Sequence, residues 1–532
     1  MRSFYSYGPV DCRSHFCVPR RELIERCAGQ LIGNLDKGGR YFTIWAPRQT
    51  GKTWVMRQVR DDILVGYKDH FIVGTMSVQG TVFKDDDDVD SFLENVPILI
   101  WETFKLRIDT PNDWRAFRRL FDRTDGIFNR PIILFIDEFD SLPPKVIDML
   151  VKMFRDMYLK RDSYLLHGLA LIGVRTALGV ESERGSPFNV QRSMHIPNFS
   201  KEEVAELFRQ YVDESGQDVD PVVVDKLYSV TRGQPGLVCW FGELMTEKYN
   251  PGTNNTIDIA TFERVYHRAL RVEFNNTVLN LVKKARGIYR EHVVRLFTSA
   301  DIVFNVDEQW CNYLYYNGII DSETIMDGLG QEVTICRFTC PFVQKRLYGA
   351  LTGDLAGDVS TIPPLDILDT LSDVFESERL NLPAILERYK DYLRRLSAKG
   401  LNPWQGQPRR AELHYTEAVG HFHLYAWLQA AVGRRCIISP EFPTGNGKVD
   451  LHLRCGGIEG IIEVKSLTNV SALAADREQA AGYAAGLGRD AVTIALFVPS
   501  DDEDVHAQLS GMNVVGQVRV TVVSMLSCLD CG

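Results

Sequence analysis

The segment Ala46–Thr53 reads APRQTGKT and lies between a strand-like apolar run and a helix-like run. A loop in this position points backbone N–H groups of a helix N-terminus at an anion, and phosphate is the usual occupant. In such a loop Lys52 would reach the terminal phosphates and Thr53 would hold Mg²⁺. Ala46 replaces the usual first glycine, whereas the Gly51, Lys52 and Thr53 core is intact. The spacing therefore predicts a phosphate-binding loop.

A second motif, which is acidic, follows further along the chain, where the apolar run PIILFIDEFD ends in Asp137 and Glu138. Asp137 can bind Mg²⁺ directly or through water, and Glu138 can orient and deprotonate an attacking water. A GKT sequence at a helix start could occur by chance. Its combination with an acidic strand end predicts hydrolysis of a nucleoside triphosphate.

The segment Gly447–Ser466 reads GKVDLHLRCGGIEGIIEVKS and joins two strand-like runs through a glycine turn. Strand alternation puts Asp450 and Glu463 on one face, and Lys465 shares that face because it lies two residues beyond Glu463. Burying these charges is costly unless they are paired. Two carboxylates can hold one or two Mg²⁺ ions that activate water, and a lysine can orient that water or neutralise developing charge.

Two helix-like runs flank this hairpin. The upstream run contains Glu417 and His421, and the downstream run contains Gln479 and Tyr483. Each pair is four residues apart, so its members share one helix face. Glu441 precedes the hairpin, either as a third acidic contributor or as a loop charge.

Composition narrows the class of protein. The chain has 532 residues and a formal net charge of −10, so any nucleic-acid surface must be local. Its apolar runs are shorter than the roughly 18 residues of a membrane span. The first residues, MRSFYSYGPVD, lack the apolar core of a signal peptide. We expect a cytoplasmic protein without a membrane partner.

The eleven cysteines argue against a disulfide framework, since their number is odd and they are scattered through strands and helices. Neither the cluster Cys12, Cys17 and Cys27 nor the pair Cys528 and Cys531 forms the paired CxxC spacing of a zinc site. We expect ordinary free thiols.

Strand-like runs alternate with helical patterns from about Tyr41 to Ile196, which is typical of a parallel α/β sheet. Ser200, with Glu203 three residues later, predicts the start of a helical segment. A hairpin-like pattern, DSETIMDGLGQEVTICRF, suggests a winged-helix-like module, and tandem prolines mark a linker. The fold class expected is α/β and multidomain. The expected domains are a P-loop ATPase core (1–198), a helical lid (199–270), a winged-helix-like module (271–360), a helical linker (361–410) and a second α/β domain (411–532).

The first half of the chain resembles the STAND and archaeal-type branch of AAA-related ATPases over about residues 4–350. The matching segments are the upstream CVPRREL (Cys17–Leu23), the strand end LIGVRT and the lid motif RGQPGLV. The resemblance implies that the upstream segment packs near the base, that Arg175 senses the γ-phosphate and that Pro235 lies near the adenine. Arg161 is a weaker candidate for an arginine finger in a neighbouring subunit.

Asp450, Glu463 and Lys465 with their flanking helices resemble the PD-(D/E)XK nuclease superfamily over about residues 411–525. In that superfamily the first helix often supplies a glutamate, here Glu417, and exonuclease-like branches carry a Gln-x-x-x-Tyr helix. Some branches use a histidine as a metal ligand, which makes His421 a candidate. The expected restriction-endonuclease-like domain would use Mg²⁺, or Mn²⁺, as its cofactor.

These patterns together predict an ATP-dependent or ATP-regulated, metal-dependent nuclease that acts on DNA, with the ATPase as a switch. A role in antiviral or mobile-element defence would suit this design by analogy alone. The alternatives are an ATP-driven DNA-processing motor with a nuclease, and a nucleotide-controlled DNA-binding scaffold whose nuclease fold is inactive. A homo-oligomer or an activating partner is left open.

Overall fold

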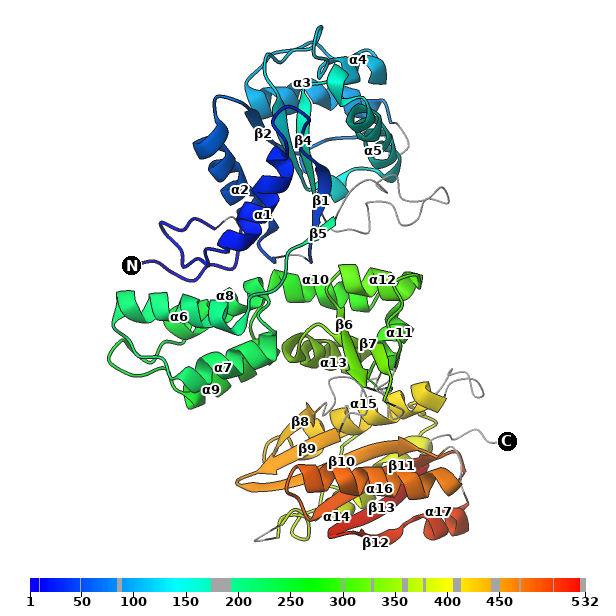
Figure 1. Cartoon of the computed structure of the whole chain (residues 1–532). Coiled ribbons are helices and arrows are strands. Elements are labelled where there is room, and N and C mark those ends of the chain that lie inside the picture. Colours follow the sequence, from blue (N-terminus) through cyan, green and yellow to red (C-terminus); the bar gives the residue numbers. More distant parts are fainter. Residues whose placement is uncertain are drawn as a thin grey trace. The chain divides into compact units, whose positions relative to one another are not determined.

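The computed structural model describes residues 1–8, 10–47, 49–83, 89–173, 193–297, 299, 302–326, 330–355, 362–376, 379–404, 413–441, 450–467, 470–500 and 502–526. The chain divides into two compact units (Figure 1). The first unit contains Met1–Thr277 and Asn312–Gly318, and the second contains Val278–Cys311 and Ile319–Gly532. Among the described residues, no helix is long and apolar enough to cross a membrane.

The first unit is built on a parallel sheet with the strand order β2-β3-β4-β1-β5 (Figure 1). The four longer strands were predicted from their apolar runs, and the parallel α/β class is confirmed. The fifth strand is a short addition that the sequence pattern did not indicate. The strands are β1 (Tyr41–Trp45), β2 (Ile72–Ser77), β3 (Ile132–Asp137), β4 (Leu166–Gly173) and β5 (Ser193–His195).

Helices cover both faces of this sheet because alternate strand residues point to opposite sides. In β3, Leu134 and Ile136 belong to one apolar core, whereas Ile133 and Phe135 belong to the other. The first core includes residues of α3 and α5, and the second includes residues of α1 and α2. The helices are α1 (Arg21–Ile32), α2 (Lys52–Tyr67), α3 (Ser91–Phe104), α4 (Trp114–Arg119) and α5 (Pro144–Leu159).

A helical segment completes the first unit. Its first helix begins with the predicted capping box, in which the Ser200 hydroxyl accepts from the Glu203 N–H and the Glu203 carboxylate accepts from the Ser200 N–H. Its last α-helix starts at the side-chain cap of Asp258. The helices are α6 (Lys201–Ser215), α7 (Pro221–Thr231), α8 (Pro235–Glu243) and α9 (Ile259–Arg271).

The second unit begins with helices and a hairpin in the region where a winged-helix-like module was predicted. The hairpin strands pair antiparallel, with Ile320 opposite Phe338. The last helix, α13, packs against the hairpin and also against the long helix α15. The elements of this region are α10 (Asn276–Ala285), α11 (Arg290–Arg295), β6 (Ile320–Met326), β7 (Glu332–Phe338) and α13 (Pro341–Leu355). Helix α12 (Gln309–Tyr316) lies between α11 and β6 in the sequence, and most of it belongs to the first unit.

A mixed sheet forms the rest of the second unit, with the order β12-β13-β11-β10-β9-β8 (Figure 1). Strands β8, β9 and β10 form an antiparallel meander, and helix α16 leads to β11, which runs parallel to β10. The elements are α14 (Leu382–Ser397), α15 (Leu413–Val432), β8 (Ile437–Glu441), β9 (Asp450–Cys455), β10 (Ile458–Ser466), α16 (Val470–Gly486), β11 (Ala491–Val498), α17 (Glu503–Leu509), β12 (Gly511–Val515) and β13 (Val518–Leu526).

Helix α14 lies inside the predicted 361–410 linker, yet it packs against the mixed sheet. The Tyr389 ring contacts Phe497 of β11 and Trp427 of α15, and its hydroxyl forms a hydrogen bond with His423. The proline-rich boundary therefore precedes a helix that belongs to the core of the second unit.

The expectation that all cysteines are free thiols is wrong for four of them. Cys12 pairs with Cys17, and Cys436 pairs with Cys455. The second pairing follows from strand register: Ile437 lies opposite Arg454, so the next pair of positions brings the two cysteines together. Cys528 and Cys531 lie outside the described residues.

Candidate active sites

The loop between β1 and α2 has the geometry of an anion site. Strand β1 ends at Trp45, and Gly51 caps α2 with a φ of 87°, a conformation that favours glycine. The first N–H groups of α2 are thereby directed toward the loop. The Lys52 ammonium donates to the carbonyl oxygens of Ala46 at 2.7 Å and Pro47 at 2.9 Å. An incoming phosphate must compete with these carbonyls for the ammonium.

The end of β3 meets the start of α2. The Thr53 hydroxyl donates to the Asp137 carboxylate at 3.1 Å, although 84 residues separate them. Asp137 is 9% exposed, and its other oxygen accepts from the Glu138 N–H at 2.9 Å. Glu138 is half-buried and has a φ of 55°, which is uncommon for a residue with a side chain. The two expected Mg²⁺ ligands are therefore adjacent.

This arrangement fits Mg²⁺ in the manner of a nucleotide site. Protein-bound Mg²⁺ commonly takes one or two protein oxygens together with substrate phosphates and waters. Thr53 and Asp137 supply such oxygens beside the loop. In the described part of the chain, no group of three or more acidic, histidine or cysteine side chains is arranged to hold a metal.

A largely apolar cavity of about 680 Å³ of empty space, partly open to solvent, borders the loop at Gly51. Cys17 and Val18 of the upstream segment line it, as do Pro235 and Gly236 at the start of α8. The segments that the family resemblance assigned to the base thus surround one cavity beside the phosphate loop. Burial raises the pKa of the Cys239 thiol in its wall to about 12, so that thiol is uncharged at neutral pH.

The helical segment contacts the loop directly. The Gly236 N–H donates to the Gln49 carbonyl at 3.0 Å. Gly233 has a φ of 69° and its carbonyl accepts from the Phe199 N–H at 2.8 Å. A Cβ on Gly233 would lie 1.9 Å from the Phe199 carbonyl oxygen, so only glycine fits there. The conformation of the loop is consequently tied to the position of α8.

Of the two candidate arginines, the structure describes only Arg161. Arg175 lies outside the described residues. Arg161 precedes β4 and so lies toward the amino-terminal ends of the parallel strands. The phosphate loop follows the carboxyl-terminal end of β1. The Arg161 guanidinium donates to the Lys37 carbonyl at 2.6 Å and stacks on the Tyr158 ring. These contacts are internal to the first unit.

The hairpin of the second unit pairs Asp450 directly opposite Glu463. Opposed residues on neighbouring strands share a face, as the alternation of the sequence predicts. Only the backbone of Asp450 is among the described features. Glu463 and Lys465 are 3% and 2% exposed, and the Lys465 ammonium lies 2.6 Å from one Glu463 carboxylate oxygen. This pair is almost fully removed from solvent.

The second oxygen of Glu463, Oε2, is buried without a hydrogen-bond partner among the described residues. Leaving a buried carboxylate oxygen unsatisfied is costly. A divalent cation between Glu463 and the opposite position, Asp450, would satisfy that oxygen. Carboxylate oxygens are the ligands that Mg²⁺ and Mn²⁺ prefer, so the residues present fit the expected cation.

The flanking helices reach the same strand. The Glu417 carboxylate accepts from the Ser466 N–H at 3.3 Å, and the Gln479 side-chain oxygen lies 3.4 Å from the Lys465 ammonium. The Tyr483 hydroxyl lies 3.4 Å from a ring nitrogen of His452. Glu417 of α15 and Gln479 of α16 therefore meet residues at the end of β10, whereas Tyr483 contacts β9.

The sequence analysis missed Asp476, whose carboxylate lies 3.7 Å from the Lys465 ammonium. Asp476, Gln479 and Tyr483 occupy positions i, i+3 and i+7 of α16, and this spacing could have identified it. His421, a candidate ligand, instead forms a hydrogen bond with the Tyr348 hydroxyl of α13. Glu441 lies opposite Asp450 on the other side of β9.

A protein-family model matches the first half of the chain. Residues 5–276 match the family model described as the AAA-like domain. No curated protein sequence matches the chain significantly.

Several solved structures are similar in fold. The Walker-type ATPase PABY2304 of Pyrococcus abyssi is 13% identical, with 65% of this chain and 99% of that chain covered and a TM-score of 0.43. The Aeropyrum pernix ORC1 protein, solved in complex with DNA, is 14% identical over 63% and 93% of the two chains, with a TM-score of 0.33. The Thermotoga maritima RuvB Holliday junction branch migration motor is 15% identical over 59% and 92%, with a TM-score of 0.31. Similarity at this level does not bear on function.

Proposed function

Since the chain belongs to the AAA-like domain family through residues 5–276, we propose that its ATPase domain controls a metal-dependent nuclease in the second unit. The nuclease would act on DNA, and the nucleotide state of the first unit would license cleavage. The five domains predicted from the sequence are kept in this proposal, except that α14 is moved from the linker to the nuclease domain because it packs in that core.

In the ATPase domain, Gly51 and Lys52 would bind the phosphates, and Thr53 and Asp137 would hold Mg²⁺. Glu138, which directly follows Asp137 at the end of β3, would orient and deprotonate the attacking water. The contact between Thr53 and Asp137 supports this assignment. Pro235 lines the cavity where the base would lie, and Arg175 remains the proposed γ-phosphate sensor.

In the second unit, the observation that carries the proposal is the buried pair of Glu463 and Lys465, in which one carboxylate oxygen has no hydrogen-bond partner among the described residues. Asp450 and Glu463 would hold Mg²⁺ or Mn²⁺. The bound cation would lower the pKa of a water and stabilise the charged transition state of phosphodiester hydrolysis. Lys465 would orient that water. Glu417, Gln479 and Tyr483 would support the β-strands that carry the reacting residues.

The order of elements supports the same proposal. Helix α15, the β8-β9-β10 meander, the crossover helix α16 and the parallel strand β11 follow in the order typical of the PD-(D/E)XK core. The hairpin β6–β7 is a weaker candidate for phosphate contact, because it carries Asp321, Glu323 and Glu332. DNA is therefore assigned to the mixed sheet.

The direct test is cleavage of plasmid and linear DNA by the full chain with Mg²⁺ or Mn²⁺, with and without ATP. Asp450→Ala and Lys465→Ala should each lower cleavage by at least about 100-fold, because each removes a group that acts on the reacting atoms. ATP hydrolysis by both variants should stay at the wild-type rate, and urea unfolding of the second unit controls for its folding. Unchanged cleavage in both variants would refute the assignment, and a wild-type chain that binds DNA without cutting it would favour the scaffold alternative.

A further inference from the structure

We propose that Asp476 of α16 is the residue that positions Lys465 for the reaction. This inference rests on the proposed nuclease function. The Lys465 ammonium lies between two acidic groups, at 2.6 Å from the Glu463 carboxylate on its own strand and at 3.7 Å from the Asp476 carboxylate on the crossover helix. The Gln479 side-chain oxygen, at 3.4 Å, is a third neighbour from the same helix.

Lys465 requires a second anionic partner because Glu463 cannot serve it alone once a cation is bound. The side chain of Lys465 is 2% exposed, so its charge depends on protein partners rather than on water. A divalent cation bound to Glu463 would attract its carboxylate away from Lys465, and the cation would also repel the Lys465 ammonium. Asp476 approaches from α16 and provides a compensating charge that the metal-binding strand does not supply.

Asp476 belongs to the crossover helix α16, whereas the proposed metal ligands Asp450 and Glu463 belong to strands β9 and β10. Its carboxylate lies 3.7 Å from the Lys465 ammonium, and its own side chain is 22% exposed, which leaves it partly hydrated. Asp476 therefore acts through Lys465, with Gln479 one turn further along α16.

Steady-state cleavage kinetics test this role. Asp476→Asn keeps the side-chain shape and removes the charge, so kcat should fall by about 10-fold or more, while KM for DNA and the Mg²⁺ concentration for half-maximal cleavage change less than about twofold. Asp476→Glu should recover most of the lost kcat. Glu478→Gln is the matched control, because Glu478 is exposed on the same helix, and it should behave like the wild type.

A second measurement does not depend on cleavage. Lys465 should resist modification by an amine-reactive reagent in the wild type and in Glu478→Gln, as followed by mass spectrometry, and should become at least about threefold more reactive in Asp476→Asn. If labelling of Lys465 increases in Asp476→Asn but the wild-type chain does not cleave DNA, the positioning role is supported and the nuclease function is refuted. Unchanged kcat together with unchanged labelling in Asp476→Asn would overturn the inference. A defect that saturating Mg²⁺ repairs would overturn it too, because Asp476 would then be a metal ligand.

Discussion

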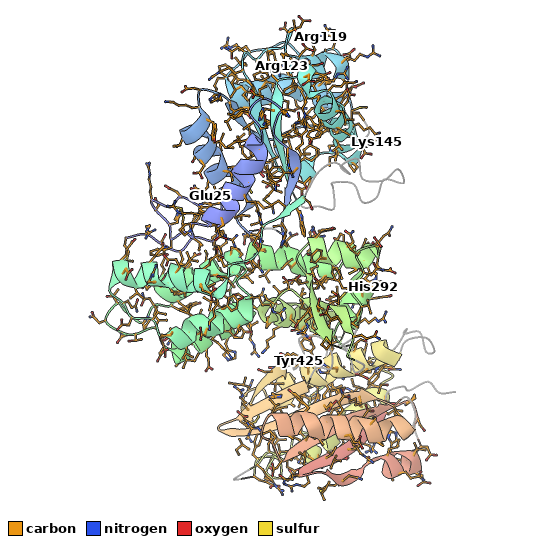
Figure 2. All side chains as sticks on the ribbon, in the orientation of Figure 1. Glu25, Arg119, Arg123, Lys145, His292 and Tyr425 are labelled. Carbon is orange, nitrogen blue, oxygen red and sulfur yellow. A yellow bond between two sulfur atoms is a disulfide. The ribbon has the colours of Figure 1, made fainter. Side chains whose placement is uncertain are left out.

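Tyr348 and His421 are 73 residues apart in the sequence and share a buried hydrogen bond between α13 and α15. The Tyr348 ring also stacks on Phe422, with ring centroids 4.4 Å apart. Helix α15 carries Glu417, which accepts from the backbone at the end of β10. Figure 2 marks Tyr425 on the same helix, and its ring packs against Tyr348. Helix α13 thus contacts the helix that supports the proposed metal strand.

Tyr348→Phe should therefore weaken the second unit and slow DNA cleavage. The substitution preserves the ring stacking but leaves the buried His421 nitrogen without its partner, at a cost of about 1–3 kcal/mol. ATP hydrolysis should be unchanged, since the first unit is untouched. Urea unfolding of Tyr348→Phe, His421→Phe and the double variant would measure the coupling. Strictly additive effects of the two substitutions would contradict a shared hydrogen bond.

Gly233→Ala should disrupt the joint between the sheet and the helical segment of the first unit. Its φ of 69° already costs about 1–2 kcal/mol for alanine, and the new Cβ would meet the Phe199 carbonyl at 1.9 Å. Phe199 and Pro235 line the candidate nucleotide cavity, so ATP binding should weaken as well.

Gly216→Ala is the matched control for this prediction. Gly216 has the same φ of 69°, but no atom lies within 4 Å of a Cβ built there. The control should lose only the conformational cost and should bind ATP normally, as measured by calorimetry. Equal losses of ATP affinity in both variants would argue that backbone strain, and not the Phe199 contact, is responsible.

The stability of the second unit should depend on pH through His423. Burial lowers the pKa of His423 to about 4, against about 6.5 for an unfolded histidine. Between these values the unfolded chain binds a proton that the folded chain excludes, so the free energy of unfolding falls as the pH drops from 6.5 toward 4, by about 3 kcal/mol in all. Above pH 6.5 the group is neutral in both states and contributes no pH dependence.

His423→Gln removes this titration while retaining a polar group near Tyr389, the hydrogen-bond partner of His423. Urea unfolding of the second unit at pH 7.5, 6 and 5 should give a flatter pH dependence in the variant than in the wild type. Parallel curves would show that His423 does not control acid stability.

Lys52→Ala should abolish ATP binding, because the ammonium that would meet the phosphates is lost. Glu138→Gln should bind ATP and hydrolyse it at least about 100-fold more slowly, since Thr53 and Asp137 still hold the metal while the base is gone. Filter binding and phosphate release distinguish the two variants. Normal hydrolysis by Glu138→Gln would place the base elsewhere.

The local pattern of the sequence was sufficient to predict most strands of the parallel sheet and the start of helix α6 in the first unit. Four apolar runs became the long strands of the parallel sheet, and Ser200 with Glu203 formed the predicted capping box. Strand β5 (Ser193–His195) escaped prediction because three residues are too few to show a period. The strand order is set by contacts between distant residues, which no local pattern encodes.

Nonlocal packing also explains what the sequence analysis missed in the second unit. Helix α14 was assigned to a linker because tandem prolines precede it, whereas its buried Tyr389 joins the core through α15 and β11. Asp476 lies outside the motif that drew attention to Lys465, and only the packing of α16 on the sheet brings the two together. The roles of Asp450, Glu463 and Lys465 stay predictions.

The central claim is that ATP bound to the first unit switches on a nuclease in the second. A time course of plasmid cleavage by Glu138→Gln with Mg²⁺, with and without ATP, tests it most directly, with Lys52→Ala as the nucleotide-free reference. Glu138→Gln with ATP should cleave at least as fast as the wild type, because binding without turnover holds the active arrangement. Cleavage should be slow without ATP and insensitive to ATP in Lys52→Ala. Poor cleavage by ATP-bound Glu138→Gln would indicate a motor that needs turnover, and equal cleavage under all these conditions would contradict any coupling between the two units.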